Sequence, residues 1–120
     1  MGIKQVCFAA LCIVVASVGQ CLAQATGNQI REGCQIGLQD DHSITLIDAR
    51  KSGFCLGFVD AIIILGNELA EPDRFCLPKG VTLEQAIHVL LKYLNEHPDL
   101  THEDAVTLAL WAFKAAWPCQ

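Results

Sequence analysis

Residues 49–70 read ARKSGFCLGFVDAIIILGNELA. Apolar side chains recur at helical spacing along one face of this segment, which predicts one long helix: Phe54, Phe58, Ile62 and Leu65. Other apolar residues cover much of the remaining surface, as is typical of a helix buried in the centre of a fold. Gly53 and Gly57 lie one turn apart, so we expect another backbone to approach closely. Asp60 is predicted to be a hydrogen-bonded carboxylate in the core.

Two more helices are expected after this central one. Thr82 begins a capping box with Gln85, and the apolar face that follows extends to about Glu96. Pro98 ends this helix, and the next is expected to begin at a Thr101 cap, with acidic residues in its first turn, where the helix dipole favours them. The buried stripe of that last helix is predicted to contain Ala105, Leu108, Trp111, Ala112 and Ala115.

A further helix is expected before the central one, over residues 26–38. Its apolar residues recur every four positions, at Ile30, Cys34 and Leu38. Residues 39–43 form a polar break, and residues 44–47 (ITLI) are compatible with a short extended piece. The sequence therefore predicts an all-α fold, a small four-helix bundle.

The N-terminal residues have the layout of a secretory signal peptide. A positive charge precedes the apolar run of residues 6–18, and small residues follow at Ala23 and Ala25, either of which is a suitable cleavage site. A transmembrane helix needs about 20 apolar residues, and this run is shorter. We therefore expect residues 1–25 to be removed on export, leaving no membrane anchor and a single domain of residues 26–120.

Four cysteines follow the predicted signal peptide: Cys34, Cys55, Cys76 and Cys119. An even number in a small exported domain is typical of disulfides, and no CxxC motif or tight Cys/His pair favours a metal site. Short connections make neighbouring helices antiparallel, which brings Cys34 near Cys55 and Cys76 near Cys119. We therefore predict that Cys34–Cys55 and Cys76–Cys119 staple the bundle.

Composition and motifs exclude several classes of function. The formal net charge of -5 argues against a nucleic-acid-binding protein, which needs a basic surface. The sequence contains no nucleophile elbow, phosphate-binding loop or zinc-protease motif. His97 and His102 have no metal-ligand spacing. The sequence thus predicts a protein that is not an enzyme and carries no cofactor.

Several segments resemble the Tai/Rap immunity family. They read CLGFVDA at residues 55–61, FCLPKGVTLEQ at 75–85, KYLNEHP at 92–98, AF at 112–113 and WPC at 117–119. The resemblance covers most of residues 53–119, and before them only Cys34. Members of the family are small, helical periplasmic proteins. Characterised members bind and inhibit peptidoglycan amidase effectors delivered by type VI secretion, so the resemblance implies the same partner and compartment for this chain.

An inhibitor without chemistry of its own acts by filling a cleft, and the amidases of this system resemble papain-like cysteine peptidases. We expect the contacts to come from the loop between the third and fourth helices, which Pro98 stiffens: Asn95, Glu96, His97, Pro98, Asp99, Leu100, Thr101 and His102. The alternative for this loop is a solvated connector with a helix cap. The next candidate surface is the exposed face of the third helix around Glu84, His88 and Lys92.

Other interpretations stay open on the sequence alone. The expected bundle is HdeA-like, and an acid-stress chaperone of that kind would open and expose its central helix as carboxylates are protonated. A periplasmic enzyme that uses His97 or His102 would require a metal. The family resemblance also leaves room for a homodimer, which the apolar residues permit.

Overall fold

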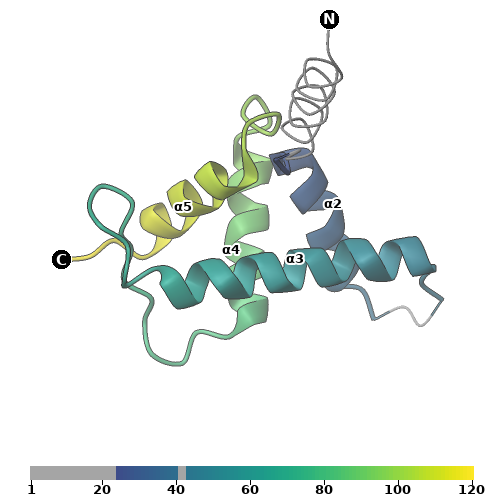
Figure 1. Ribbon diagram of the computed structural model, residues 1–120, viewed down its shortest axis with the longest axis horizontal. Coiled ribbons are helices and arrows are strands. Elements are labelled where there is room, and N and C mark those ends of the chain that lie inside the picture. The colour runs from purple at the N-terminus through teal and green to yellow at the C-terminus, as the bar shows by residue number, and fades with distance from the viewer. Residues whose placement is uncertain (1–23, 41–42) are drawn as a thin grey trace, which may run out of the picture.

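The computed structural model describes residues 24–40 and 43–120, which form four α-helices and no strand (Figure 1). The helices are α2 (Gly27–Gly37), α3 (Leu46–Leu65), α4 (Leu83–Glu96) and α5 (Ala105–Ala116). The predicted all-α, four-helix fold is confirmed. The predicted signal peptide lies outside the described residues except for Gln24 and Ala25. Within the described part, no helix has the length and apolarity needed to cross a membrane.

Local capping fixes where the helices begin. Three threonines form capping boxes, in which each threonine and the residue three positions later exchange hydrogen bonds: Thr26 with Gln29, Thr45 with Asp48, and Thr82 with Gln85. The box at Thr82 confirms the prediction for α4. The box at Thr45 starts α3 early, so Leu46 and Ile47 are helical and the expected extended piece is wrong.

The expected cap at Thr101 is also wrong, because the residue that caps α5 is Asp104, whose carboxylate accepts from the Thr107 amide. The hydroxyl of Thr101 instead donates to the Pro98 carbonyl, at 3.0 Å. Threonine and aspartate are both favoured N-cap residues, so the residue type alone does not distinguish Thr101 from Asp104. The Asp104 carboxylate also accepts from the Thr107 hydroxyl at 3.1 Å, and this second hydrogen bond favours the later start.

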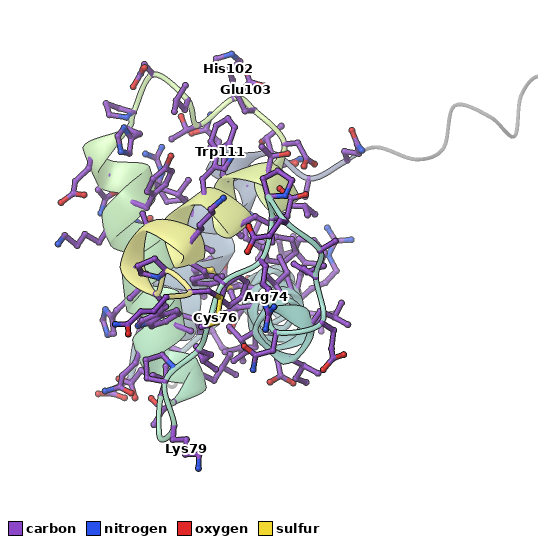
Figure 2. The ribbon with its side chains drawn as sticks, turned by 90° about the vertical axis from the view of Figure 1, so that its left-hand side faces the viewer. Arg74, Cys76, Lys79, His102, Glu103 and Trp111 are labelled. Carbon is purple, nitrogen blue, oxygen red and sulfur yellow. A yellow bond between two sulfur atoms is a disulfide. The ribbon has the colours of Figure 1, made fainter. Side chains whose placement is uncertain are left out.

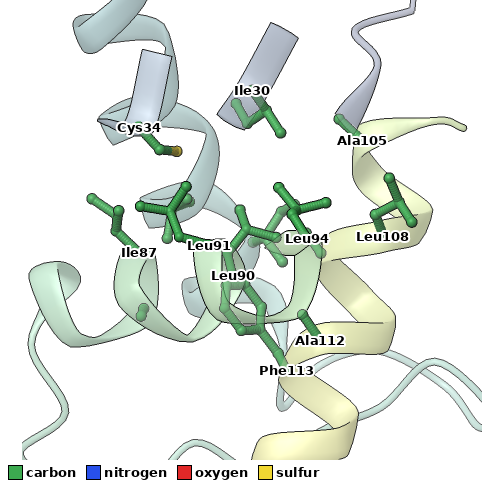
Figure 3. Packing of buried hydrophobic residues seen from close by; sticks show 14 of the residues in the cluster. Ile30, Cys34, Ile87, Leu90, Leu91, Leu94, Ala105, Leu108, Ala112 and Phe113 are labelled. Carbon is green, nitrogen blue, oxygen red and sulfur yellow. The ribbon is translucent and has the colours of Figure 1, made fainter. Parts of the chain in front are cut away.

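Helix α4, and not α3, lies at the centre of the core. Figure 3 shows the buried side chains of α4 packed between those of α2 and α5. The helix contributes Ala86, Ile87, Leu90, Leu91 and Leu94 to the core. Phe75, from the loop that precedes α4, packs on Phe113 of α5 with ring centroids 5.4 Å apart. Trp111 and Ala115 are exposed, contrary to expectation, because both lie away from the centre of the buried stripe on α5.

Helix α3 is covered on one side only, which contradicts the prediction of a helix buried all round. Its buried residues are Cys55, Val59 and Ile62, whereas Phe54 and Leu65 are about half exposed. Its last residue is Leu65, and turns follow over residues 66–73. The reason is the small number of elements: α3 contacts α2, α4 and α5, and Figures 1 and 2 show α4 and α5 on the same side of it.

Two further expectations for α3 are wrong for the same reason. Asp60 lies on the exposed face and is not a core carboxylate. Gly53 and Gly57 lie on that face too. Apart from the adjacent residues and the backbone of α3 itself, no described residue comes within 4 Å of the position that a Cβ would occupy at either glycine. The close backbone approach occurs instead at Gly33 of α2, where a Cβ would lie 2.4 Å from the Lys51 carbonyl oxygen of α3.

The two disulfides join the expected pairs. Cys34–Cys55 links α2 to α3, with the Cα atoms 5.1 Å apart. Cys76–Cys119 links the segment before α4 to the segment after α5, with the Cα atoms 4.9 Å apart. Beside the first disulfide, the Lys51 ammonium pairs with the Glu32 carboxylate at 2.6 Å. Each disulfide therefore ties together segments that are far apart in sequence.

Alanine substitutions at two helical glycines are expected to have opposite effects on stability. Gly33→Ala forces a methyl group into the Lys51 carbonyl, and we expect it to lower the free energy of unfolding by about 1–3 kcal/mol. Gly53→Ala meets open space in the middle of a helix, and we expect it to raise that free energy by about 0.5–1 kcal/mol. Urea denaturation of dilute protein measures both. Equal effects of the two substitutions would contradict the close packing of α2 on α3.

Candidate functional site

The segment between α4 and α5 is folded by its own hydrogen bonds. The His97 amide donates to the Tyr93 carbonyl at 3.0 Å and ends α4. The Leu100 amide then donates to His97, at 3.1 Å, and the Glu103 amide to Leu100, at 2.9 Å. With the Thr101 hydroxyl bonded to Pro98, these turns give the segment one defined shape.

The beginning of α2 holds this loop from the side. Two backbone hydrogen bonds join the two segments, from the Asn28 amide to the Thr101 carbonyl at 2.8 Å and from the Gly27 amide to the Glu103 carbonyl at 3.0 Å. The approach requires a glycine, since a Cβ at Gly27 would lie 2.9 Å from the Thr101 carbonyl oxygen and 2.5 Å from Leu108. The loop is therefore fixed at both of its own ends and also along its length.

Most of the eight residues predicted to contact a partner are accessible. Five are exposed and two are half-buried: Asn95, Glu96, Pro98, Asp99 and His102, and then His97 and Leu100. Thr101 is only 6 % exposed, so its side chain shapes the loop from inside. Figure 2 shows His102 and Glu103 at one end of the molecule and Lys79 at the opposite end.

Negative charge gathers along this end. Glu96, Asp99 and Glu103 are exposed, and the Glu103 carboxylate lies 3.2 Å from the His102 imidazole. Burial of the phenol raises the pKa of Tyr93, and the negative charge of Asp99 raises it further. Tyr93 also packs on the His97 ring, with the ring centroids 4.4 Å apart. The loop thus presents exposed carboxylates next to the packed rings of Tyr93 and His97.

Part of the second candidate surface adjoins the loop. An open groove between α2 and α4 is lined by Gln35, Leu38, Gln39, His88, Leu91, Lys92, Asn95 and Glu96. His88 and Lys92 therefore share one groove with the first two loop residues. Glu84 does not line this groove, although its carboxylate lies 3.9 Å from His88. The two surfaces proposed from the sequence are continuous at this groove.

Sequence patterns missed two exposed residues, of which one adjoins the loop. Glu103 follows directly on the predicted set, and its exposure and its contact with His102 make it part of the same surface. Trp111 was assigned to the core from the apolar pattern, yet it is 46 % exposed. Its position one residue before Ala112, outside the 105/108/112 repeat, was the available signal.

The described residues offer binding surfaces and no metal site. Residues 24–40 and 43–120 contain no group of three or more His, Cys, Asp or Glu side chains that could hold a metal ion. His102 is paired with Glu103, and His97 packs on Tyr93.

The buried hydroxyl of Thr101 is expected to hold the loop in its shape. Thr101→Val keeps the volume and removes the hydrogen bond to Pro98, so we expect a loss of about 1 kcal/mol in the free energy of unfolding. Amide hydrogen exchange should become faster at Leu100 and Glu103 in particular. Thr107→Val, which removes a hydroxyl contact to Asp104 in the first turn of α5, is the control. Unchanged exchange in the loop of Thr101→Val would contradict this role.

A comparison with protein families now adds to the geometry. The model of the Rap1a immunity proteins matches residues 26–119, from the capping threonine of α2 to the last cysteine of the second disulfide. No curated protein and no solved structure gives a significant match. The match confirms the resemblance that the sequence motifs indicate. This family is non-enzymatic, and an immunity protein has a cognate effector as its partner. The chain therefore belongs to the Rap1a immunity protein family.

Proposed function

We propose that this protein is a periplasmic immunity protein that binds a peptidoglycan amidase effector of a type VI secretion system. In this proposal it inhibits the amidase by placing residues 95–102 in the active-site cleft. The observation that carries the proposal is the family match over residues 26–119. The shape and charge of the loop support the choice of surface.

The rigidity of the loop favours it as the inhibitory element. A flexible segment loses conformational entropy when it enters a cleft, and this loss weakens binding. Here the turns at Leu100 and Glu103, together with the hydrogen bonds from α2, hold the backbone in place before any partner arrives. Pro98, Asp99 and His102 are exposed on that backbone. The loop therefore enters a cleft with little additional ordering.

Charge supports the same surface. The amidases in question resemble papain-like cysteine peptidases, whose cleft contains a Cys/His pair. Carboxylates such as Asp99 and Glu103 complement a cationic histidine. The formal net charge of -5 also increases the rate of association with a basic cleft. Blocking of the cleft requires no reaction by the chain itself.

Two features support export to the periplasm. Residues 1–25 have the layout of a cleavable signal peptide. The chain has two disulfides. Disulfides persist in oxidising compartments and are rare in the cytosol. We also propose that the exported chain forms a homodimer, which the exposed apolar residues of α3 support.

The proposal is tested by isolating the partner and then removing the loop contacts. The full chain, tagged at its C-terminus, is expressed in its native periplasm at neutral pH, and we expect a peptidoglycan hydrolase to co-purify in stoichiometric amount. In the purified complex, Asp99→Ala combined with Leu100→Ala is expected to weaken binding about 30-fold, as loss of about 2 kcal/mol at an interface centre does. Calorimetry and amidase inhibition measure the effect.

The matched control is Lys79→Ala, an exposed residue at the opposite end of the molecule, which should leave the affinity unchanged. If the Asp99→Ala/Leu100→Ala variant keeps its affinity for the amidase, the assignment of the loop as the inhibitory element is wrong. In that case His88→Ala with Lys92→Ala tests the adjoining groove. Protection of client proteins at strongly acidic pH, without any hydrolase bound at neutral pH, would instead support the acid-stress chaperone.

A further inference from the structure

The residue before the capping threonine of α2 is part of the fold. Ala25 is half-buried and packs against the core. Its carbonyl accepts a hydrogen bond of 2.8 Å from the Ala105 amide. Gln24 is exposed, and with Ala25 it lines an open pocket beside α3 and the beginning of α5. The folded unit therefore begins before the first helix.

Residues 25–27 lie alongside residues 103–105, and an antiparallel bridge joins the middle residues of the two segments (Figure 1). Ala105 is the first residue of α5, so its amide has no acceptor within that helix. Ala105 is also only 1 % exposed. Removal of Ala25 would therefore take away the acceptor of an amide that lies at a buried position.

The sequence allows two sites for removal of the signal peptide. Signal peptidase selects a small residue at the last position of the signal and another small residue two positions earlier. Cleavage after Ala23 meets this rule with Cys21, and cleavage after Ala25 meets it with Ala23. The rule thus allows a mature chain that begins at Gln24 and one that begins at Thr26. Only the first of these contains Ala25.

We propose that the chain is cleaved after Ala23 and that the mature protein begins at Gln24. Water is added across this peptide bond, so Ala23 receives the new carboxyl group and Gln24 the new amino group. The inference rests on the export proposed above. It shortens the segment that the sequence leads us to expect to be removed, residues 1–25, by two residues.

Hydrogen bonds on both sides protect the later bond in the folded chain. A peptidase binds the carbonyl oxygen of the bond that it cleaves in an oxyanion hole. The Ala25 carbonyl is already bonded to the Ala105 amide. On the other side of the bond, the Thr26 amide donates to the Gln29 side chain at 2.9 Å. The bond between Ala25 and Thr26 is therefore a poor substrate once the chain has folded.

Retention of Ala25 has a consequence for the proposed inhibitory loop. Residues 103–105 follow the loop directly, and the hydrogen bond to Ala25 is one of the contacts that fix them. A chain that begins at Thr26 lacks this hydrogen bond, so the end of the loop is held less firmly. Cleavage after Ala23 thus preserves the shape in which the loop meets the effector.

Mass spectrometry of the intact, oxidised protein tests the cleavage site directly. The full chain, tagged at its C-terminus, is exported and purified from the periplasm, and we expect the mass of a chain that begins at Gln24. An N-terminal glutamine can lose ammonia when its amino nitrogen attacks its own side-chain amide, so the mass of the cyclised form counts as the same result. A chain that begins at Thr26, or one that retains the signal, would overturn the inference.

Two substitutions in the full chain separate the two sites. Ala25→Leu places a large side chain at the last position of the later site only, so we expect processing as in the wild type. Cys21→Arg places a large charged side chain in the earlier site only, so we expect slower cleavage and a product that begins at Thr26. An uncleaved Cys21→Arg chain also supports the earlier site. An uncleaved Ala25→Leu chain, or a Cys21→Arg chain processed as in the wild type, contradicts it.

Amide hydrogen exchange in the two products measures the role of Ala25. Exchange at Ala105 should be at least about fivefold faster in the chain that begins at Thr26 than in the wild type. The Cys76 amide, which donates to the Trp117 carbonyl, is the control and should exchange equally in both. Equal exchange at Ala105 would show that Ala25 does not hold the beginning of α5.

Amidase inhibition separates this inference from the proposed function. We expect the chain that begins at Thr26 to inhibit the co-purified amidase more weakly than the wild type, and equal inhibition would contradict the consequence for the loop. If no amidase co-purifies, the proposed function is overturned alone, because the masses and the exchange rates do not depend on the effector.

Discussion

Helix α2 is the element on which the arrangement of the rest depends. At its first turn, Gly27 and Asn28 bind the loop between α4 and α5 through backbone hydrogen bonds. Further along, Cys34 is joined to α3 by a disulfide, and Gly33 lets the backbone of Lys51 come close. A helix of 11 residues thus fixes both the candidate inhibitory loop and the helix with the uncovered face. Without it, α3 would be attached to the core by few buried residues.

The second disulfide stabilises the C-terminal half of the fold. Cys76–Cys119 closes the unit formed by α4 and α5, and the Cys76 amide donates to the Trp117 carbonyl beside it. Closing a loop of this length contributes roughly 4 kcal/mol in the chain-entropy model. That contribution matters because a domain of this size buries a modest core, to which α4 and α5 contribute the most residues. Stability therefore depends on covalent links as well as on apolar burial.

Features that depend on a few neighbouring residues were accessible from the sequence. The Thr82 capping box and the end of α4 before Pro98 are of this kind. The pairing of four cysteines far apart in sequence was accessible for another reason, since short connections make neighbouring helices antiparallel. Asp104, and not Thr101, caps α5, because the Thr101 hydroxyl bonds to Pro98 inside the loop whereas the Asp104 carboxylate accepts two hydrogen bonds from Thr107. The exposure of one side of α3 could not be predicted from the sequence. The apolar pattern of a helix indicates how much of its surface is hydrophobic, but not how many other elements the fold has to cover that surface.

The wrong predictions for α3 share one physical origin, which is that one side of the helix has no element packed against it. Asp60 was expected inside and buried apolar neighbours were expected around it, whereas both occupy a face open to solvent. Only α2, α4 and α5 are available among the described residues to cover this helix, and its apolar side chains exceed the surface that these three elements bury. The exposed face therefore follows from the number of elements in the fold.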